Sequence, residues 1–162
     1  MKKHNFIICL VVSLTILTLS CKPKVDIENE KADILKYYDK TITAAMEEDL
    51  SLLESLTHDT TFYVYNGTIQ KFSKEEDIAN FREQFNKTDF NSIIKLVEPD
   101  IRLSPDGKMA WMTGKLKIEY SFVQDDGMII ENEIEDAFLM VLEKSEDGWK
   151  TVVQAETFPK DE

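Results

Sequence analysis

The chain has 162 residues, a formal net charge of −12 and only two cysteines. This length fits one domain, since domains typically have roughly 100–200 residues. Hydrophobic residues make up 43% of the chain, which is enough for a globular core. The acidity argues against a nucleic-acid binder, because a polyanion would be repelled. Two cysteines are too few for a disulfide-stabilised scaffold.

The first residues predict a secretory signal peptide that ends in a lipidation site. Lys2 and Lys3 precede an apolar run over residues 6–19, which is shorter than the about 20 residues that a transmembrane helix needs. The end of this run, LTLSC at residues 17–21, resembles the bacterial lipobox. The resemblance implies cleavage directly before Cys21 and lipid modification of its thiol. The alternative is an ordinary signal peptide or membrane anchor with an incidental cysteine.

We therefore expect a signal peptide at residues 1–20, a lipidated cysteine and polar tether at residues 21–31, and one domain at residues 32–162. Removal of the signal leaves 17 basic residues against 31 acidic ones, so the mature net charge becomes −14. Such a chain is not attracted to anionic headgroups and would depend on acyl chains, palmitate among them, for membrane binding. The expected location is the cell envelope. Lys22 after the cysteine favours the outer membrane, on its periplasmic or surface face, by resemblance to the sorting rule of some Gram-negative lipoproteins.

Helical periodicity dominates the first part of the domain. Between residues 32 and 56 apolar residues recur every three or four positions, which predicts an amphipathic helix. The acidic run at residues 47–49 is expected to divide it into two pieces. Further on, Ser73 and Glu76 have the spacing of a capping box and predict a second helix over residues 73–86.

Strand patterns fill most of the remaining sequence. A short strand is expected at residues 61–66, and four longer ones follow at residues 90–103, 109–124, 128–144 and 149–158. Pro99 predicts a bulge, because proline cannot donate a hydrogen bond to a neighbouring strand. Tight turns join the last three strands into an antiparallel meander, and the helices must cover its apolar face. The expected class is α+β.

The order of these elements resembles the nuclear transport factor 2-like superfamily, also called SnoaL-like or ketosteroid-isomerase-like. The most similar segments are EDLSLLESL at residues 48–56, YNG at residues 65–67 and LEKSEDGWKTVV at residues 142–153. The resemblance implies a cone-shaped fold, in which N-terminal helices pack on a curved antiparallel sheet around an apolar pocket. It also implies a homodimer formed through the sheet face.

The chain departs from the isomerases of this superfamily at the positions that their chemistry requires. The position of their aspartate base falls near Tyr65, and a tyrosine cannot replace a carboxylate at neutral pH. The last strand, in which many small members carry a histidine, has QAET at residues 154–157. Because the same fold serves enzymes, ligand binders and assembly domains, the resemblance gives no activity. Whether the protein is an enzyme stays open, and these departures argue against it.

Asp136 is the main candidate for a polar residue of the pocket. The strand at residues 128–144 alternates in polarity, and Asp136 belongs to its otherwise apolar face. Burial there would raise the pKa of this carboxyl, whereas an aspartate at the rim of the cone would be solvated. The other candidates are aromatic side chains, which either line an open pocket or fill a solid core: Tyr38, Phe62, Tyr65, Tyr120 and Phe138.

Neither a metal nor a cofactor is expected. The opposite face of the strand at residues 128–144 carries a row of glutamates that is expected to form cross-strand ion pairs with two lysines rather than a calcium site: Glu131, Glu133 and Glu135, with Lys115 and Lys117. His58 is the one histidine that remains after signal removal, which is too few for zinc, and it is expected in a surface loop.

Three functional hypotheses follow. The first is a lipid-anchored, non-catalytic module that binds a small apolar molecule or mediates assembly, with Asp136, Tyr38 and Tyr65 as polar contacts in its pocket. The second is a small isomerase-like or dehydratase-like enzyme for an apolar carbonyl compound, with Asp136 as acid or base and either tyrosine as hydrogen-bond donor. The third is a structural homodimer in an envelope complex, formed through an exposed face that includes Trp111. The enzyme requires a cavity of roughly 300 Å³ or more with converging titratable groups.

Overall fold

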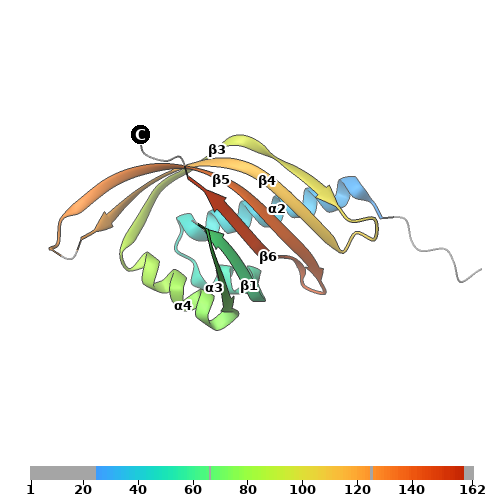
Figure 1. Ribbon diagram of the computed structural model, residues 1–162, viewed down its shortest axis with the longest axis horizontal. Helices are drawn as coiled ribbons and strands as arrows, with labels where there is room; N and C mark the ends of the chain where they lie inside the picture. Colours follow the sequence, from blue (N-terminus) through green and yellow to red (C-terminus); the bar gives the residue numbers. More distant parts are fainter. Residues whose placement is uncertain (1–24, 66, 125, 159–162) are drawn as a thin grey trace, which may run out of the picture.

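A single curved sheet of six strands wraps three helices in the computed structural model, which describes residues 25–65, 67–124 and 126–158 (Figure 1). The predicted signal peptide and the predicted lipidation site, Cys21, lie outside the described residues. Within the described part of the chain, no helix is both long and apolar enough to cross a membrane.

The long N-terminal helix α2 (Ile27–Met46) begins five residues earlier than Ala32, where the apolar periodicity starts. The reason is an N-cap: the side chain of Asp26 accepts a hydrogen bond from the backbone N–H of Asn29. Residues 27–31 of the expected tether are therefore helical, which corrects that prediction.

The predicted break after α2 lies at residues 47–49, where Glu48 adopts a positive φ of 53°. The next helix, α3 (Leu50–Leu56), is capped by the side chain of Asp49, which accepts from the backbone N–H of Leu52 at 2.9 Å. The acidic run thus separates α2 from α3 by local hydrogen bonding as well as by its low hydrophobicity.

The capping box is confirmed at the start of α4 (Lys74–Phe85). The Ser73 hydroxyl accepts from the backbone N–H of Glu76, and the Glu76 carboxylate accepts from the backbone N–H of Ser73 at 2.8 Å. Two backbone donors that would otherwise lack partners are satisfied, so the helix begins at the predicted position.

The strands form one sheet in the order β2-β1-β6-β5-β4-β3, with β1 parallel to β6 and the other pairs antiparallel. Their bounds are β1 (Thr57–Tyr65), β2 (Thr68–Ser73), β3 (Thr88–Leu103), β4 (Met109–Val123), β5 (Ile129–Ser145) and β6 (Gly148–Thr157). The meander of β4, β5 and β6 is as predicted. The irregular register of β3 between Val97 and Asp100 is the bulge expected at Pro99. Strand β2 was not predicted, because most of its side chains are exposed and show no alternation.

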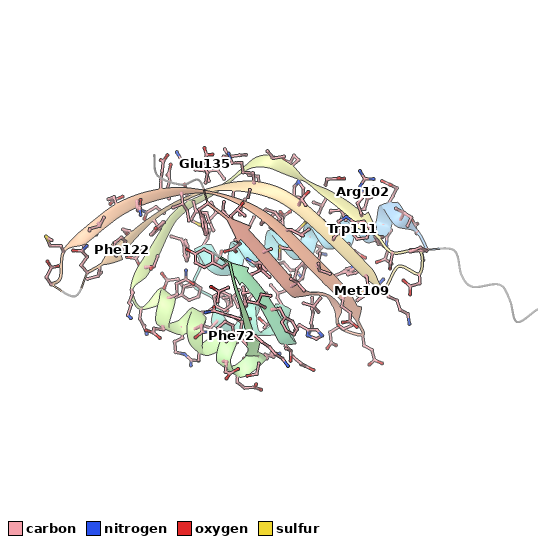
Figure 2. The ribbon with its side chains drawn as sticks, in the orientation of Figure 1. Phe72, Arg102, Met109, Trp111, Phe122 and Glu135 are labelled. Atoms are coloured by element: carbon pink, nitrogen blue, oxygen red, sulfur yellow. The ribbon has the colours of Figure 1, made fainter. Side chains whose placement is uncertain are left out.

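The two faces of the sheet differ in polarity. The concave face packs on α2 and supplies much of the main core, with these buried residues on β4 and β5: Ala110, Met112, Leu116, Phe138, Met140 and Leu142. The outer face carries ion pairs, and Lys117 lies 2.9 Å from Glu133. Lys115 likewise pairs with Glu135, whose side chain points away from the helices in Figure 2. These contacts confirm the expected cross-strand pairs for Glu133 and Glu135, whereas Glu131 accepts a hydrogen bond from the Asn91 amide instead.

Candidate functional site

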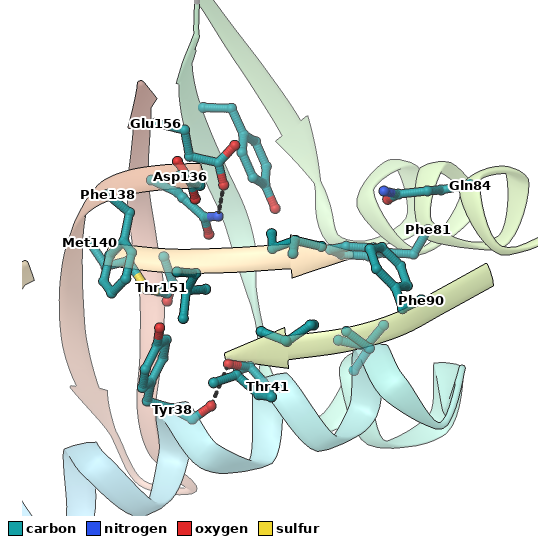
Figure 3. A pocket seen from close by; sticks show the side chains of 18 of the residues that line it. Tyr38, Thr41, Phe81, Gln84, Phe90, Asp136, Phe138, Met140, Thr151 and Glu156 are labelled. Atoms are coloured by element: carbon teal, nitrogen blue, oxygen red, sulfur yellow. Dashed lines mark hydrogen bonds between the residues drawn. The ribbon is translucent and has the colours of Figure 1, made fainter. Parts of the chain in front are cut away.

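A cavity of about 490 Å³ lies between the concave face of the sheet and the helices (Figure 3). Its volume is within the range of small-molecule sites, roughly 300–1,000 Å³. Four of the six predicted lining residues line it: Tyr38 from α2, Tyr120 from β4, and Asp136 and Phe138 from β5. The cone is therefore hollow rather than filled.

The other two predicted lining residues, Phe62 and Tyr65, are not among the residues that line the cavity. Phe62 lies on the outer face of β1, with the Lys71 ammonium 5.7 Å from its ring centroid. Tyr65 is the last residue of β1 and is 46% exposed. Its ring contacts Phe158 at a centroid distance of 5.4 Å. The tyrosine of β1 that does line the cavity is Tyr63.

Asp136 and Tyr38 bring two unpartnered polar atoms to the cavity. Asp136 is 5% exposed and Tyr38 is 3% exposed. Among the described residues, neither Oδ1 of Asp136 nor the hydroxyl of Tyr38 has a hydrogen-bond partner. A buried polar group without a partner costs about 1–3 kcal/mol. The two atoms are therefore the groups of the cavity with the most to gain from a bound molecule.

The environment of Asp136 strongly disfavours its ionised form. Burial raises the pKa of this carboxyl to about 7, the negative charge of Glu156 raises it as well, and a backbone hydrogen bond from Thr157 lowers it. Burial also raises the pKa of the Tyr38 hydroxyl, and the negative charge of Asp136 raises it further. Tyr38 is therefore neutral at physiological pH, while Asp136 exchanges its proton near neutrality.

A bulge in β6 turns Glu156 toward the cavity. The pairing of β6 with β5 shifts register at Val152. Before this irregularity Thr151 lines the cavity, and after it Gln154 and Glu156 do so. The Gln154 amide donates a hydrogen bond to the Glu156 carboxylate (Figure 3). Without the extra residue, strict alternation would have placed both side chains on the outer face.

A third acidic residue of the cavity, Asp77 on α4, was missed in the sequence. It is buried, and the Tyr63 hydroxyl lies 2.9 and 3.0 Å from its two carboxylate oxygens. Burial raises the pKa of Asp77, and the hydrogen bond from Tyr63 lowers it. Nearby, the Tyr37 hydroxyl accepts from the backbone N–H of Thr151 at 3.0 Å. In the sequence Asp77 is indistinguishable from the other acidic residues of the first helical turn.

Gly114 makes room for one aromatic wall of the cavity. A Cβ atom at this position would lie 2.6 Å from Cζ of Phe138, the residue opposite it on β5. The Phe138 ring in turn contacts the ring of Tyr38 at a centroid distance of 5.4 Å. A larger residue in place of Gly114 would push this ring toward the cavity.

His58 and the acidic side chains outside the cavity do not form a second functional site among the described residues. His58 lies in β1 rather than in the expected loop, and its Nδ1 accepts from the backbone N–H of Thr60 at 3.1 Å. It is not among the lining residues. The described residues contain no group of three or more histidine, cysteine, aspartate or glutamate side chains placed to hold a metal ion.

An α+β cone with a cavity between its helices and its curved sheet defines the nuclear transport factor 2-like fold. A model of the SnoaL-like domain matches residues 34–159, and the chain belongs to this family. No curated protein matches the chain.

Solved structures share the fold at low sequence identity. An NTF2-like protein from Cytophaga hutchinsonii is 20% identical, with 80% of this chain and 98% of that chain covered and a TM-score of 0.63. A ketosteroid isomerase-like protein from Erwinia carotovora atroseptica is 15% identical, with 80% and 96% covered and a TM-score of 0.63. The S. rosetta CaMKII hub is 16% identical, with 86% and 98% covered and a TM-score of 0.59.

The pKa of Asp136 predicts how stability depends on pH. Its folded value of about 7 lies above the ordinary value of 3.8. Between these values the folded protein holds a proton that the unfolded chain has released, so the free energy of unfolding falls as the pH rises. A tenfold change in the acid dissociation constant on folding corresponds to about 1.4 kcal/mol of stability. Asp136→Asn should therefore flatten this fall and make the protein more stable than the wild type at pH 8, as measured by urea unfolding.

The matched control is Glu146→Gln, which changes an exposed side chain outside the cavity. It should retain the wild-type pH dependence. Parallel curves for the wild type and Asp136→Asn across this interval would contradict a raised pKa at Asp136.

Proposed function

We propose that this domain binds a small, largely apolar molecule in its cavity without transforming it. The observation that carries this proposal is the pair of buried, unpartnered polar atoms on Asp136 and Tyr38 in a cavity of about 490 Å³. Apolar and aromatic side chains would bury the body of the ligand, and polar groups of the ligand would satisfy the two atoms. Binding of this kind requires no nucleophile and no metal.

An isomerase-like or dehydratase-like enzyme for an apolar carbonyl compound is the second candidate. It is favoured by the near-neutral pKa of Asp136, which suits proton transfer at physiological pH. Of the two tyrosines expected as donors only Tyr38 could assist it, because Tyr65 does not line the cavity. The binding proposal ranks first because the aspartate base position of the isomerases holds no carboxylate in this chain.

We also propose that the domain is a lipoprotein of the cell envelope, anchored through acyl chains on Cys21. The support is the sequence alone: a basic start, an apolar run and the LTLSC segment at residues 17–21. The outer membrane is the favoured location. An anchor of this kind would hold the cavity close to a membrane, where apolar molecules are concentrated.

Finally, we propose that a second copy of the chain packs on the outer face of the sheet. Several large apolar side chains are exposed there, including Trp111 at 45%. The strand register connects exposed Trp111 to exposed Phe62 through two half-buried valines, since Trp111 pairs with Val141, Val141 with Val153, and Val153 with Phe62. A continuous apolar strip of this kind is typical of a protein–protein contact.

Filling the cavity should abolish ligand binding. Ala45 lines the cavity from α2, and Ala45→Phe would add an aromatic ring to that space. Nile red, a neutral apolar dye, should bind the wild-type protein with a rise in fluorescence and should bind Ala45→Phe at least tenfold more weakly. The matched control is Ala137→Phe, since Ala137 is exposed and lies outside the cavity lining. Equal dye binding by both variants would refute a ligand site in the cavity.

Replacing Cys21 should release the protein from membranes. In the host bacterium, Cys21→Ser should move the protein from the membrane fraction to the soluble fraction, because no acyl chain can be attached. Cys9→Ser is the control, since this cysteine lies in the segment that is expected to be removed. Continued membrane retention of Cys21→Ser would contradict lipid anchoring.

Placing a charge on the outer strip should dissociate the dimer. Trp111→Asp is expected to convert a dimer to a monomer in analytical ultracentrifugation, because an unpaired charge would be buried in the contact. Ile27→Asp, at an exposed position on α2 and away from the sheet, should leave the dimer intact. A wild-type protein that sediments as a monomer would exclude this interface.

A further inference from the structure

The charges of the cavity are all of one sign. Three carboxyl groups line it, from Asp77 on α4, Asp136 on β5 and Glu156 on β6. Among the described residues that line it there is no lysine, arginine or histidine. The cavity therefore has no cation to balance its carboxylates, and it would repel an anionic ligand.

The three carboxyl groups differ in their hydrogen-bond partners. The Asp77 carboxylate accepts from the Tyr63 hydroxyl, and the Glu156 carboxylate accepts from the Gln154 amide. Only Asp136 keeps a buried oxygen, Oδ1, without a partner. A group that donates hydrogen bonds and carries positive charge would satisfy this oxygen and offset its repulsion from Glu156.

Two packed aromatic rings line the same cavity as Asp136. The ring of Phe138, two residues along β5, packs against the ring of Tyr38 on α2. Both side chains line the cavity (Figure 3). Ring faces attract a desolvated cation. The Tyr38 hydroxyl oxygen, which lacks a partner, can accept a hydrogen bond from a bound ligand.

We propose that the cavity selects an organic cation, namely a protonated primary or secondary amine with an apolar or aromatic body, whose ammonium group donates to the Asp136 carboxyl. This inference rests on the proposed binding function and narrows its ligand class. Several other lining side chains are apolar and suit the body of the ligand: Ile93, Leu116, Ile118, Ile134 and Phe90.

Selection of a cation couples binding to pH. Asp136 faces the carboxylate of Glu156 and the hydroxyl of Tyr38. Lys95 has its ammonium 5.4 Å from the Tyr38 ring centroid, is paired with Asp39 and does not line the cavity. Since Asp136 has a pKa of about 7 in the free protein, a bound ammonium favours its ionised form and binding near pH 7 releases a proton.

Three small ligands of similar shape test the charge preference: phenethylamine, phenethyl alcohol and phenylacetate. Isothermal titration calorimetry at pH 8 should give an affinity for the amine at least tenfold higher than for the alcohol, with no measurable binding of phenylacetate. The amine affinity should fall at least tenfold at pH 5.5, where Asp136 is protonated, and titrations in two buffers at pH 7 should detect proton release.

Asp136→Asn separates the charge effect from the shape of the cavity. This variant should lower the amine affinity at least tenfold and remove its pH dependence, and Glu156→Gln should lower it by a smaller factor. Glu146→Gln, outside the cavity, should behave as the wild type. Circular dichroism establishes that each variant is folded.

The outcomes distinguish this inference from the proposed function. If Nile red binds but the alcohol binds as tightly as the amine, charge selection is wrong while the ligand site stands. Charge selection is also wrong if the amine binds without proton release, or if it binds Asp136→Asn as tightly as the wild type. If neither Nile red nor the amine binds, both the ligand site and its charge preference are wrong.

Discussion

Asp136 places a carboxyl group on the apolar inner face of β5. The free-energy cost of burying its charge determines the protonation of this group and the kind of ligand that the site favours. The group is 5% exposed, has an oxygen without a partner and faces a second carboxylate. An ionised carboxylate in such a place is costly unless it is paired. The ligand-free protein therefore holds this group in a high free-energy state, which a ligand of suitable charge relieves. The pH response of the site follows from this condition.

The curved sheet creates the space in which this condition exists. Strands β4 and β5 bend around α2 (Figure 1). The bulge in β6 turns Glu156 to the same side as Asp136. Gly114 lets the Phe138 ring lie close to β4 beside this acid pair. Small backbone features, a bulge and a glycine, thus decide which side chains meet in the cavity. The general fold is shared with proteins of 15–20% identity.

Local signals in the sequence were sufficient for much of the fold. The capping box at Ser73, the break at residues 47–49 and the alternation that places Asp136 inside all depend on residues close in the chain. The inward position of Glu156 could not be predicted, because the bulge depends on how β6 pairs with β5. Asp77 and its contact with Tyr63 depend on the packing of α4 on β1, which no local pattern encodes.

A direct titration of Asp136 tests the central claim. Nuclear magnetic resonance of the side-chain carboxyl carbon, assigned by comparison with Asp136→Asn, reports its protonation across pH 3–9. In the ligand-free protein the titration should have its midpoint near pH 7, as expected for a buried carboxyl beside Glu156. A midpoint near pH 4 would show a solvated or compensated carboxylate and would contradict the proposed role of this residue in the cavity.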